Sequence, residues 1–310
     1  MIKDKFKGCL VGVAIGDSLG AEREGSFDIS ENVNLSPRYT DDTAMMIGVA
    51  ESLINCKGFD GEDITKRFIE NYLREPWRGY GWGPPRIFNM IIKEGRSWYE
   101  MLDRKIYPGG SFGNGAAMRI APIGLLYYDN PEKLRDIVYK SSIITHSHEL
   151  AIEGAFIQAY AVSLAVKTNP PFLDKYEFLT KIKSVVKNEK YLKKIEIMEK
   201  FLKEKADKID VIKHLGNGVE ALNSVPTAIY SFLVGNSFEE SVVYAVSLGG
   251  DADTIGAMSG AIAGAYYGIE NIPLKWKEKL ENREYIEKLA EKLWEVKAEK
   301  FNQVRGQDLL

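Results

Sequence analysis

Apolar residues recur at spacings of three and four along most of the chain, which is the period of an amphipathic α-helix. Strict alternation of apolar and polar residues, the pattern of a half-buried strand, is scarce, and no strand–helix–strand rhythm is present. The sequence therefore predicts an all-α fold with, at most, a short hairpin. Helices are expected over residues 3–18, 42–56, 62–74, 84–95, 114–128, 131–144, 148–167, 173–187, 189–206, 217–234, 238–247, 252–268 and 282–303.

Several of these predicted helices are preceded by capping residues. Asp60, Asn130 and Ser237 stand just before predicted helices and can offer a side-chain oxygen to the first backbone N–H groups. Pro131 follows Asn130 at the first helical position, where proline is favoured because its missing N–H costs nothing there. These caps support the helical interpretation of the apolar period.

Nothing in the sequence divides the chain into separate domains. No Ser- or Gly-rich linker is present, and the charged segment 177–213 interleaves lysine with glutamate and aspartate, as solvated outer helices do. A chain of 310 residues can bury roughly three quarters of its unfolded surface in one domain. We therefore expect a single domain over residues 1–310.

The composition excludes several classes of protein. Hydrophobic residues make up 45% and charged residues 27%, which rules out a disordered or collagen-like chain. With 41 Lys and Arg against 44 Asp and Glu, the net charge of -3 lacks the basic excess of a dedicated nucleic-acid-binding protein. Cys9 and Cys56 form no CxxC motif, which argues against a disulfide framework and favours a cytoplasmic location.

Two apolar runs are too short to cross a membrane. The run 9–15 follows basic residues, as in a signal peptide, but Asp17 interrupts its continuation. The run 255–267 is rich in glycine and alanine and falls short of the ~20 apolar residues that a spanning helix needs. We therefore expect a soluble protein with no membrane partner.

Glycine recurs every fourth residue near both ends of the chain. Because residues four apart lie on one helix face, each series places a smooth stripe on its helix. Glycine costs ~1 kcal/mol relative to alanine inside a helix, so the repeated cost indicates a close approach of two helices in the core. The two series are Gly8, Gly12, Gly16 and Gly20, and Gly256, Gly260, Gly264 and Gly268.

The first acidic motif stands at the start of the predicted helix 42–56. Thr40 is suited to cap this helix, which places Asp41 and Asp42 in its first turn. Acidic residues favour this end of a helix for electrostatic reasons alone, so capping without further function explains an isolated TDD motif equally well.

The second acidic motif, Asp251-Ala-Asp253-Thr254, leads into the second glycine series. Its carboxylates and hydroxyl suit a helix cap, and they equally suit a hard cation that binds several oxygens. An EF-hand is excluded, because position 12 of such a loop would hold Ile262 in place of glutamate.

Charge balance links the two motifs. If Asp41, Asp42, Asp251 and Asp253 converge, their carboxylates must either be protonated or take up counter-charge, and two divalent cations would balance them. The threonines would add neutral oxygens, and ligation by oxygen alone favours Mg²⁺ or Mn²⁺ over zinc. Asp17 is a further acid, placed on the small-residue stripe, that needs donors or cations beside it.

Five motifs in order resemble those of the ADP-ribosylglycohydrolase family. They are GDSLG (16–20) with a glutamate seven residues after Asp17, YTDDTAM (39–45), SFGNGAAMR (111–119), THSH (145–148) and GGDADTIGAMSGAIAGAYYG (249–268). The resemblance implies a single-domain orthogonal bundle of many helices with a dinuclear Mg²⁺ or Mn²⁺ centre. It also implies hydrolysis of the glycosidic bond between ADP-ribose and a protein side chain or small acceptor.

The resemblance assigns roles to individual residues. Six would be metal ligands: Thr40, Asp41, Asp42, Asp251, Asp253 and Thr254. Three would be catalytic, namely Glu24, Asp41 and Asp253, with Glu24 orienting the ribose or moving a proton. Nine would bind substrate: Gly81, Gly83, Gly110, Ser111, Phe112, Gly113, Asn114, Gly115 and His146. In this interpretation the glycine-rich loops receive the diphosphate and distal ribose, Phe112 stacks on adenine, and His146 lies beside the nucleotide.

Other functions stay open at this point. Paired aspartate motifs also serve metal-dependent nucleotide phosphohydrolases, and a non-catalytic ADP-ribose-binding protein would share the fold. A serine hydrolase is disfavoured, because GGSFG at 109–113 has no strand before Ser111. The acceptor is equally open, with arginine, serine, a DNA base and small conjugates as alternatives.

Overall fold

The computed structural model describes residues 1–307, and helices dominate them. The α-helices are α1 (Ile2–Gly20), α2 (Asp41–Asn55), α3 (Gly61–Arg74), α4 (Pro84–Glu94), α5 (Gly115–Met118), α6 (Ala121–Leu126), α7 (Pro131–Ser142), α8 (Glu149–Lys167), α9 (Lys175–Lys183), α10 (Glu189–Glu204), α11 (Lys208–His214), α12 (Ala221–Val234), α13 (Phe238–Ser247), α14 (Ala252–Tyr267), α15 (Leu274–Lys277) and α16 (Arg283–Gln307). Four short 3₁₀-helices join them: η1 (Ala21–Arg23), η2 (Trp98–Glu100), η3 (Leu102–Lys105) and η4 (Ile269–Asn271). Over residues 1–307 no β-strand forms, so the all-α prediction is confirmed.

Capping explains why many helices begin where they do. Asp60 accepts hydrogen bonds of 2.9 Å from the backbone N–H groups of Glu62 and Asp63, and Asn130 accepts one of 2.9 Å from Lys133. These contacts satisfy N–H groups that have no partner within the helix itself. The caps identified from sequence therefore fix the starts of α3 and α7.

Some predicted helix boundaries are wrong. The single helix expected over 114–128 is two short helices, α5 and α6, that separate at Arg119. Pro122 lies in the first turn of α6 and has no N–H to donate to the Met118 carbonyl, so one continuous helix cannot form. The helix expected over 217–234 begins at Ala221, because the residues before it pair with the loop at Gly113.

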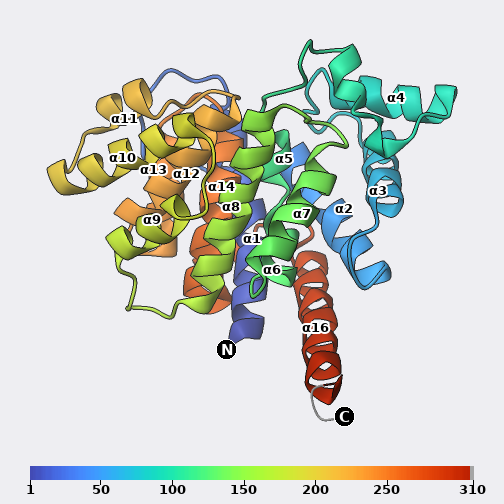
Figure 1. Ribbon diagram of the computed structural model, residues 1–310. Coiled ribbons are helices and arrows are strands. Elements are labelled where there is room, and N and C mark those ends of the chain that lie inside the picture. Colours follow the sequence, from blue (N-terminus) through green and yellow to red (C-terminus); the bar gives the residue numbers. More distant parts are fainter. Residues whose placement is uncertain (308–310) are drawn as a thin grey trace.

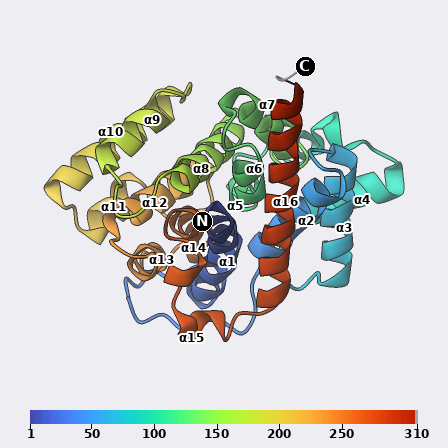
Figure 2. The ribbon, with the colours of Figure 1, turned by 90° about the horizontal axis from the view of Figure 1, so that it is seen from below.

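Helices α1 and α14 lie side by side at the centre of the molecule (Figures 1 and 2). Their glycine series face each other, since a Cβ atom on Gly12 would lie 2.2 Å from the Gly260 carbonyl oxygen. On Gly16 it would lie 2.0 Å from the Gly256 carbonyl oxygen. Only glycine permits this backbone-to-backbone contact, so the close approach expected from the sequence is present.

Helix α16 crosses this central pair at a steep angle. In Figure 2 the view runs nearly along the axes of α1 and α14, whereas α16 is seen from the side. Helices α9 to α11 lie on one side of the centre and α2 to α4 on the other (Figure 1). The expectation of one domain over residues 1–310 stays a prediction, and residues 308–310 lie outside the described chain.

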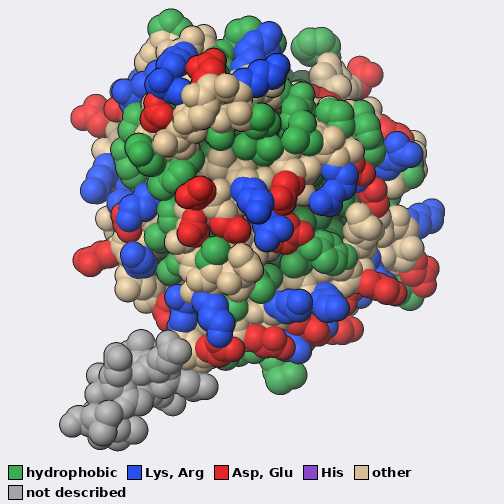
Figure 3. Space-filling model, turned by 90° about the vertical axis from the view of Figure 1, so that its right-hand side faces the viewer, with side chains coloured by type: hydrophobic (Ala, Val, Ile, Leu, Met, Phe, Trp, Pro, Cys, Tyr) green, Lys and Arg blue, Asp and Glu red, His purple; other side chains and the backbone are tan. Residues whose placement is uncertain are grey.

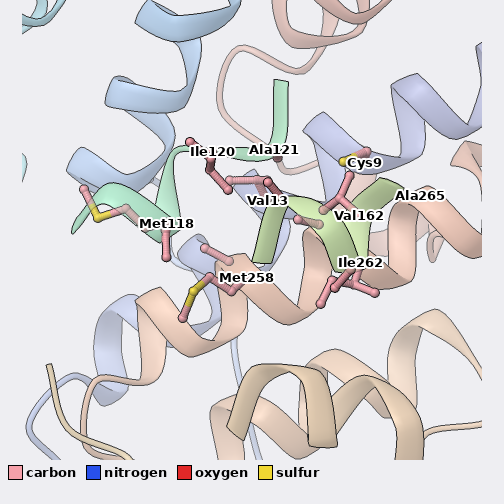
Figure 4. Close-up of a cluster of buried hydrophobic side chains, with 14 of the residues drawn as sticks. Cys9, Val13, Met118, Ile120, Ala121, Val162, Met258, Ile262 and Ala265 are labelled. Carbon is pink, nitrogen blue, oxygen red and sulfur yellow. The ribbon is translucent and has the colours of Figure 1, made fainter. Parts of the chain in front are cut away.

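The core is built from side chains of several helices that meet around α1 and α14. Figure 4 shows Cys9 and Val13 of α1 together with Val162 of α8 and with Met258 and Ile262 of α14, and all five are fully buried. Burying such side chains stabilises the fold by roughly 1.5–3 kcal/mol each. The core therefore holds together the helix ends that carry the acidic motifs.

Helix α8 is long and apolar enough to cross a membrane by length and composition, a property that the two shorter runs considered above lack. However, 83% of its most apolar window is buried inside the protein. Core helices of globular proteins pass the same test, so the property follows from the central place of α8.

Charges of both signs are interspersed on the face shown in Figure 3, which lies on the side of α3 and α4. Some pairs of opposite charge lie along single helices: Arg67 lies 3.7 Å from Asp63 in α3, and Arg283 lies 3.5 Å from Glu287 in α16. Pairs four residues apart on a helix surface typically contribute only about 0.3–0.5 kcal/mol each.

Candidate metal and substrate site

The two acidic motifs meet at one end of the central helices. Asp42, in the first turn of α2, accepts hydrogen bonds of 3.4 Å at Oδ2 from the hydroxyls of both Thr40 and Thr254. Asp42 and Thr254 lie 212 positions apart in the sequence. The fold thus meets the condition of the charge argument, which is that the two acidic motifs converge.

The first motif is held in place by a buried carboxylate, that of Asp17 in α1. Its oxygens accept hydrogen bonds of 3.0 Å from the backbone N–H of Thr40 and of 3.1 Å from that of Thr43. The Thr43 hydroxyl donates a further bond of 2.5 Å, and the Asp17 side chain is fully buried. The buried Asp17 carboxylate is therefore satisfied by hydrogen-bond donors, as the sequence analysis expected. Through these bonds it orients the turn that carries Asp41 and Asp42.

The second motif meets Glu24, which follows η1. The carboxylate oxygens of Glu24, Asp251 and Asp253 can lie within 4.8 Å of one another, a grouping that can hold a metal ion. Gly20 makes this possible, because a Cβ atom there would lie 2.4 Å from the backbone of Ala252. The end of α1 and the start of α14 therefore approach as closely as their backbones allow.

The motif is also tied to the glycine-rich loop before α5. The side-chain amide of Asn114 donates to Asp251 Oδ2 at 2.5 Å and to the Ser224 hydroxyl at 3.0 Å. The sequence predicted Asn114 as a substrate-binding residue. Its position adds a direct link between the substrate loop and the acidic cluster, which the sequence did not indicate.

Burial and mutual repulsion raise the pKa values of the clustered carboxyl groups. Burial, followed by the charge of Asp17, raises the pKa of Asp41 to about 8. Burial raises the pKa of Asp17 and of Asp251 to about 6, although hydrogen bonds to each act in the opposite direction. Burial and the charge of Asp253 raise the pKa of Asp42 well above its usual value. The cluster therefore requires protons or cations to neutralise it.

Without divalent cations, the cluster is expected to reduce the stability of the protein as the pH rises from about 4 to about 8. As the pH rises, an aspartate in the unfolded chain loses its proton at a pKa of about 3.9. In the folded protein the same carboxyl group, with its raised pKa, keeps the proton to a higher pH. The folded state then binds more protons than the unfolded state, so its stability falls as the pH rises through this window.

The measurement compares wild type with Asp41→Asn. Surface acids such as Asp136, whose pKa the neighbouring lysines lower, change the stability with pH in the opposite sense, but both proteins contain them and their effect cancels. Thermal unfolding in EDTA should show a steeper loss of stability with pH for wild type than for the variant. Saturating Mg²⁺ should remove the difference in slope. Parallel curves in EDTA would contradict the prediction.

A pocket of about 370 Å³ opens over the acidic cluster. Its lining includes the acids Glu24, Asp41, Asp42, Asp251 and Asp253 together with Thr254. It also includes eight of the nine residues predicted to bind substrate: Gly81, Gly83, Ser111, Phe112, Gly113, Asn114, Gly115 and His146. The acids and the glycine-rich loops thus share one cavity, which is large enough for part of a nucleotide.

Two predicted residues do not line the pocket. Thr40 lies behind the acids and caps α2, where its hydroxyl accepts the Asp42 N–H at 3.3 Å. Gly110, at a φ of 93°, packs against the neighbouring loop, where a Cβ atom would lie 2.5 Å from the Ser147 hydroxyl. Its glycine is required by that close packing and by the left-handed backbone.

His146 forms a neutral wall of the pocket. Burial, aided by the charge of Arg119, lowers the pKa of its imidazole to about 3. Its Nδ1 is 2.7 Å from the Thr145 hydroxyl, and the ring packs so closely on Gly115 that a Cβ atom there would lie 2.6 Å away. His146 therefore offers the pocket an uncharged hydrogen-bonding edge. Its close packing also explains why position 115 of the SFGNGAAMR motif is glycine.

Several lining residues escaped the sequence analysis: Met45, Trp82, Tyr107, Met118, Arg119 and Val219. Trp82 lies between Gly81 and Gly83, which were predicted to bind substrate, and Arg119 is the last residue of the SFGNGAAMR motif. The sequence around both residues could therefore have indicated that they line the pocket. The Arg119 guanidinium is fully buried and donates to the carbonyls of Gly115 and Ser141. Nothing in the sequence around Val219 indicates that it lines the pocket, because only the pairing of its loop with Gly113 brings it there.

The profile of the ADP-ribosylglycohydrolase family matches residues 1–303. The chain belongs to the ADP-ribosylglycohydrolase family. It is 34% identical to ADP-ribosylhydrolase ARH3 of Gallus gallus, over 94% of this chain and 93% of that protein. It is 25% identical to ADP-ribosylarginine hydrolase Tri1 of Pseudomonas putida, over 94% of this chain and 78% of that protein. A solved structure described as an ADP-ribosylglycohydrolase-related protein complex is 27% identical, with a TM-score of 0.76 over 96% of this chain and 99% of that one.

Family membership confirms the resemblance found from the five motifs and the class of enzyme that it implied, an ADP-ribosylglycohydrolase. The likeness to the solved structure extends over nearly the whole chain, so it also confirms the fold class. The roles of individual residues in metal binding and catalysis stay predictions, which the geometry of the pocket makes testable.

Proposed function

We propose that this ADP-ribosylglycohydrolase uses two divalent cations, Mg²⁺ or Mn²⁺, to cleave the glycosidic bond between ADP-ribose and a protein side chain or small acceptor. The observation that carries the proposal is the meeting of the two acidic motifs at Asp42, beneath a pocket lined by glycine-rich loops. A site built for metal-assisted hydrolysis of an anionic substrate needs both features.

The donor set fits hard cations. Asp42 Oδ1 is buried and has no hydrogen-bond partner among the described residues, and the grouped oxygens of Glu24, Asp251 and Asp253 lie within 4.8 Å. Two oxygens that share an ion at ~2.0–2.6 Å lie at most about 5 Å apart. The ions would be held by Thr40, Asp41, Asp42, Asp251, Asp253 and Thr254. When bound, they would supply Lewis acidity toward ribose hydroxyls and lower the pKa of a water.

The protein would supply the remaining functions of the site. Backbone N–H groups of the loop around Gly81 can receive a diphosphate, because a Cβ atom there would meet nothing within 4 Å and the approach is open. Phe112, half exposed at the pocket, offers a face on which adenine can stack. Glu24 is the exposed member of the acidic group, so it can exchange protons with solvent while it faces the reacting bond.

We propose an ADP-ribosylated protein or a small ADP-ribose conjugate as the substrate, and the cytoplasm as the location. The names of the relatives support the substrate class, since each is called a hydrolase of ADP-ribosyl groups. The two free cysteines, Cys9 and Cys56, support a reducing compartment.

Product analysis after incubation with a defined panel of ADP-ribose conjugates, with Mg²⁺ and separately with Mn²⁺, tests the proposal. Release of free ADP-ribose is the expected result, and the conjugate cleaved fastest identifies the acceptor. Release of AMP or phosphate would indicate a nucleotide phosphohydrolase. Binding of ADP-ribose without any product would indicate a non-catalytic binding protein. Activity in EDTA equal to that in Mg²⁺ would overturn the metal-dependent mechanism.

Replacing Glu24 by glutamine is expected to lower turnover by roughly 10²–10⁴, the usual range for loss of general acid–base assistance. Affinity for Mg²⁺ and for ADP-ribose should stay within a few-fold of wild type, because glutamine keeps the shape of the side chain and one of its two acceptor oxygens. Single-turnover rates and calorimetric titrations provide the measurement. Glu22→Gln, on the same 3₁₀ turn but outside the pocket lining, is the matched control.

Two results would contradict this role for Glu24. Full activity of Glu24→Gln would remove the residue from the catalytic set and direct attention to the remaining aspartates. Loss of Mg²⁺ binding would place Glu24 among the metal ligands, which its distance to Asp251 and Asp253 also permits.

A further inference from the structure

Two loops that form walls of the substrate pocket are joined by one buried carboxylate outside it. Asp103 lies in η3, is fully buried, and does not line the pocket. Its Oδ2 accepts a hydrogen bond of 2.8 Å from the backbone N–H of Ser111 and one of 2.7 Å from that of Ser147. These two residues are the immediate neighbours of Phe112 and His146 in the chain.

The contact is extended by the next residue. The Arg104 guanidinium donates to the Ser147 hydroxyl at 2.9 Å and to the Ser147 carbonyl at 3.4 Å. The same two loops touch again where Gly110 packs on Ser147, and where the His148 N–H donates to the Ser111 carbonyl at 3.4 Å. Three segments, which are η3 and the two pocket loops, are therefore fixed at one point.

The Asp103 carboxylate binds both loops through one oxygen. Asp103 Oδ1 is buried and has no hydrogen-bond partner among the described residues, so Oδ2 alone receives both backbone N–H groups. Bonds from N–H groups to a charged acceptor are about twice as strong as neutral ones. Neither loop belongs to a regular helix at these residues, so no ladder of helical bonds replaces this contact.

We propose that Asp103, with Arg104 on its outer side, is a positioning residue that sets the separation of the Phe112 and His146 walls for the nucleotide portion of the substrate. The inference rests on the proposed function, because it assigns that portion of ADP-ribose to the space between these loops. Asp103 acts through the loops and contacts neither the substrate nor the acidic cluster. Its loss should therefore weaken substrate binding and leave metal binding unchanged.

The test uses the full-length protein and measures KM, kcat, and the Kd values for Mg²⁺ and for free ADP-ribose. Asp103→Ala is expected to raise KM and the ADP-ribose Kd by roughly 10- to 100-fold, the scale set by loss of a hydrogen bond to a charged group. The kcat should change less than KM, and the Mg²⁺ Kd should stay within twofold. Asp103→Asn keeps an oxygen that can accept both N–H groups, so it should restore affinity to within a few-fold of wild type.

Asp174→Ala is the matched control, because Asp174 also accepts two backbone N–H groups, from Tyr176 and Glu177, far from the pocket lining. It should leave KM unchanged. If Asp103→Ala does not fold, Arg104→Met carries the test, since Arg104 is exposed and its removal frees the outer side of Ser147. This variant should raise KM several-fold.

An ADP-ribose Kd that is unchanged in Asp103→Ala, or in Arg104→Met where the first variant is unfolded, would overturn the positioning role. A parallel loss of Mg²⁺ affinity would also overturn it, because that pattern indicates general damage to the site. Failure of the proposed function gives a different result, in which the wild-type protein itself releases no free ADP-ribose from any conjugate.

Discussion

If Asp253 is a metal ligand, as proposed, replacing it by asparagine is expected to lower kcat/KM by at least about 10³, because loss of a ligand removes several kcal/mol of transition-state stabilisation. The same change should make the metal-free protein more stable to heat. Burial, followed by the charges of Asp251 and Asp17, raises the pKa of Asp253 well above its usual value. A neutral amide of the same shape removes that repulsion.

Addition of Mg²⁺ should reverse the order of stability. A ligand present at 100 times its Kd stabilises the folded protein by about 2.7 kcal/mol, and only wild type should gain this in full. Thermal unfolding of both proteins in EDTA and in Mg²⁺, together with calorimetric titration, provides the measurement. An equal Mg²⁺ response in both would place the metal elsewhere.

Asp60→Asn is the matched control for this experiment. Asp60 is an exposed cap of α3, and asparagine caps a helix about as well as aspartate. Both variants remove one negative charge, so general effects of net charge cancel in the comparison. The Asp60 variant should keep activity, Mg²⁺ response and stability close to wild type.

The helices and the acidic motifs could be predicted because their signals are local. A period of three to four apolar residues, a cap such as Asp60, and a proline after Asn130 each report on neighbouring residues. The convergence of Asp42 with Thr254 is not local, but the sequence allowed it to be stated as a hypothesis, because acids that converge can share counter-ions.

The parts that could not be predicted depend on contacts between distant segments. Asp103 looked like any surface acid, and its importance follows only from the loops that fold over it. Val219 reaches the pocket because its loop pairs with Gly113, a contact that no motif announces. The break between α5 and α6 was different in kind. Pro122 was visible in the sequence, but the apolar period continues across it and outweighed its local effect.

The glycine series illustrates how packing of the core fixes the chemistry of the site. Gly16 contacts the backbone at Gly256, and Gly20, about one helical turn further along α1, contacts the backbone at the start of α14. Asp17 lies between Gly16 and Gly20 on α1. The spacing of the two helices therefore sets the distance from Asp17, which orients the first acidic motif, to Asp253, which belongs to the second. A substitution in the glycine series should therefore change the affinity for metal ions as well as the free energy of unfolding.

Gly16→Ala is accordingly expected to lower the free energy of unfolding by about 1–3 kcal/mol, the usual cost of overpacking a core. The added Cβ atom would lie 2.0 Å from the Gly256 carbonyl oxygen, which is backbone and cannot move aside as a side chain can. This cost should exceed the ~1 kcal/mol that alanine gains over glycine in a helix. The displacement of α1 from α14 should also weaken Mg²⁺ binding.

Gly48→Ala in α2 separates the collision from the general effect of removing a helical glycine. Its Cβ atom would lie 3.3 Å from the Cβ atom of Arg67 and from side-chain atoms of Phe68 and Asn71, so an adjustment of only a few tenths of an ångström is required. Urea unfolding should therefore show a midpoint near or above that of wild type for Gly48→Ala and a clearly lower one for Gly16→Ala, with similar slopes. Equal midpoints for the two variants would mean that α1 and α14 tolerate separation, and the contact between their backbones would then not explain why both helices carry glycine at every fourth position.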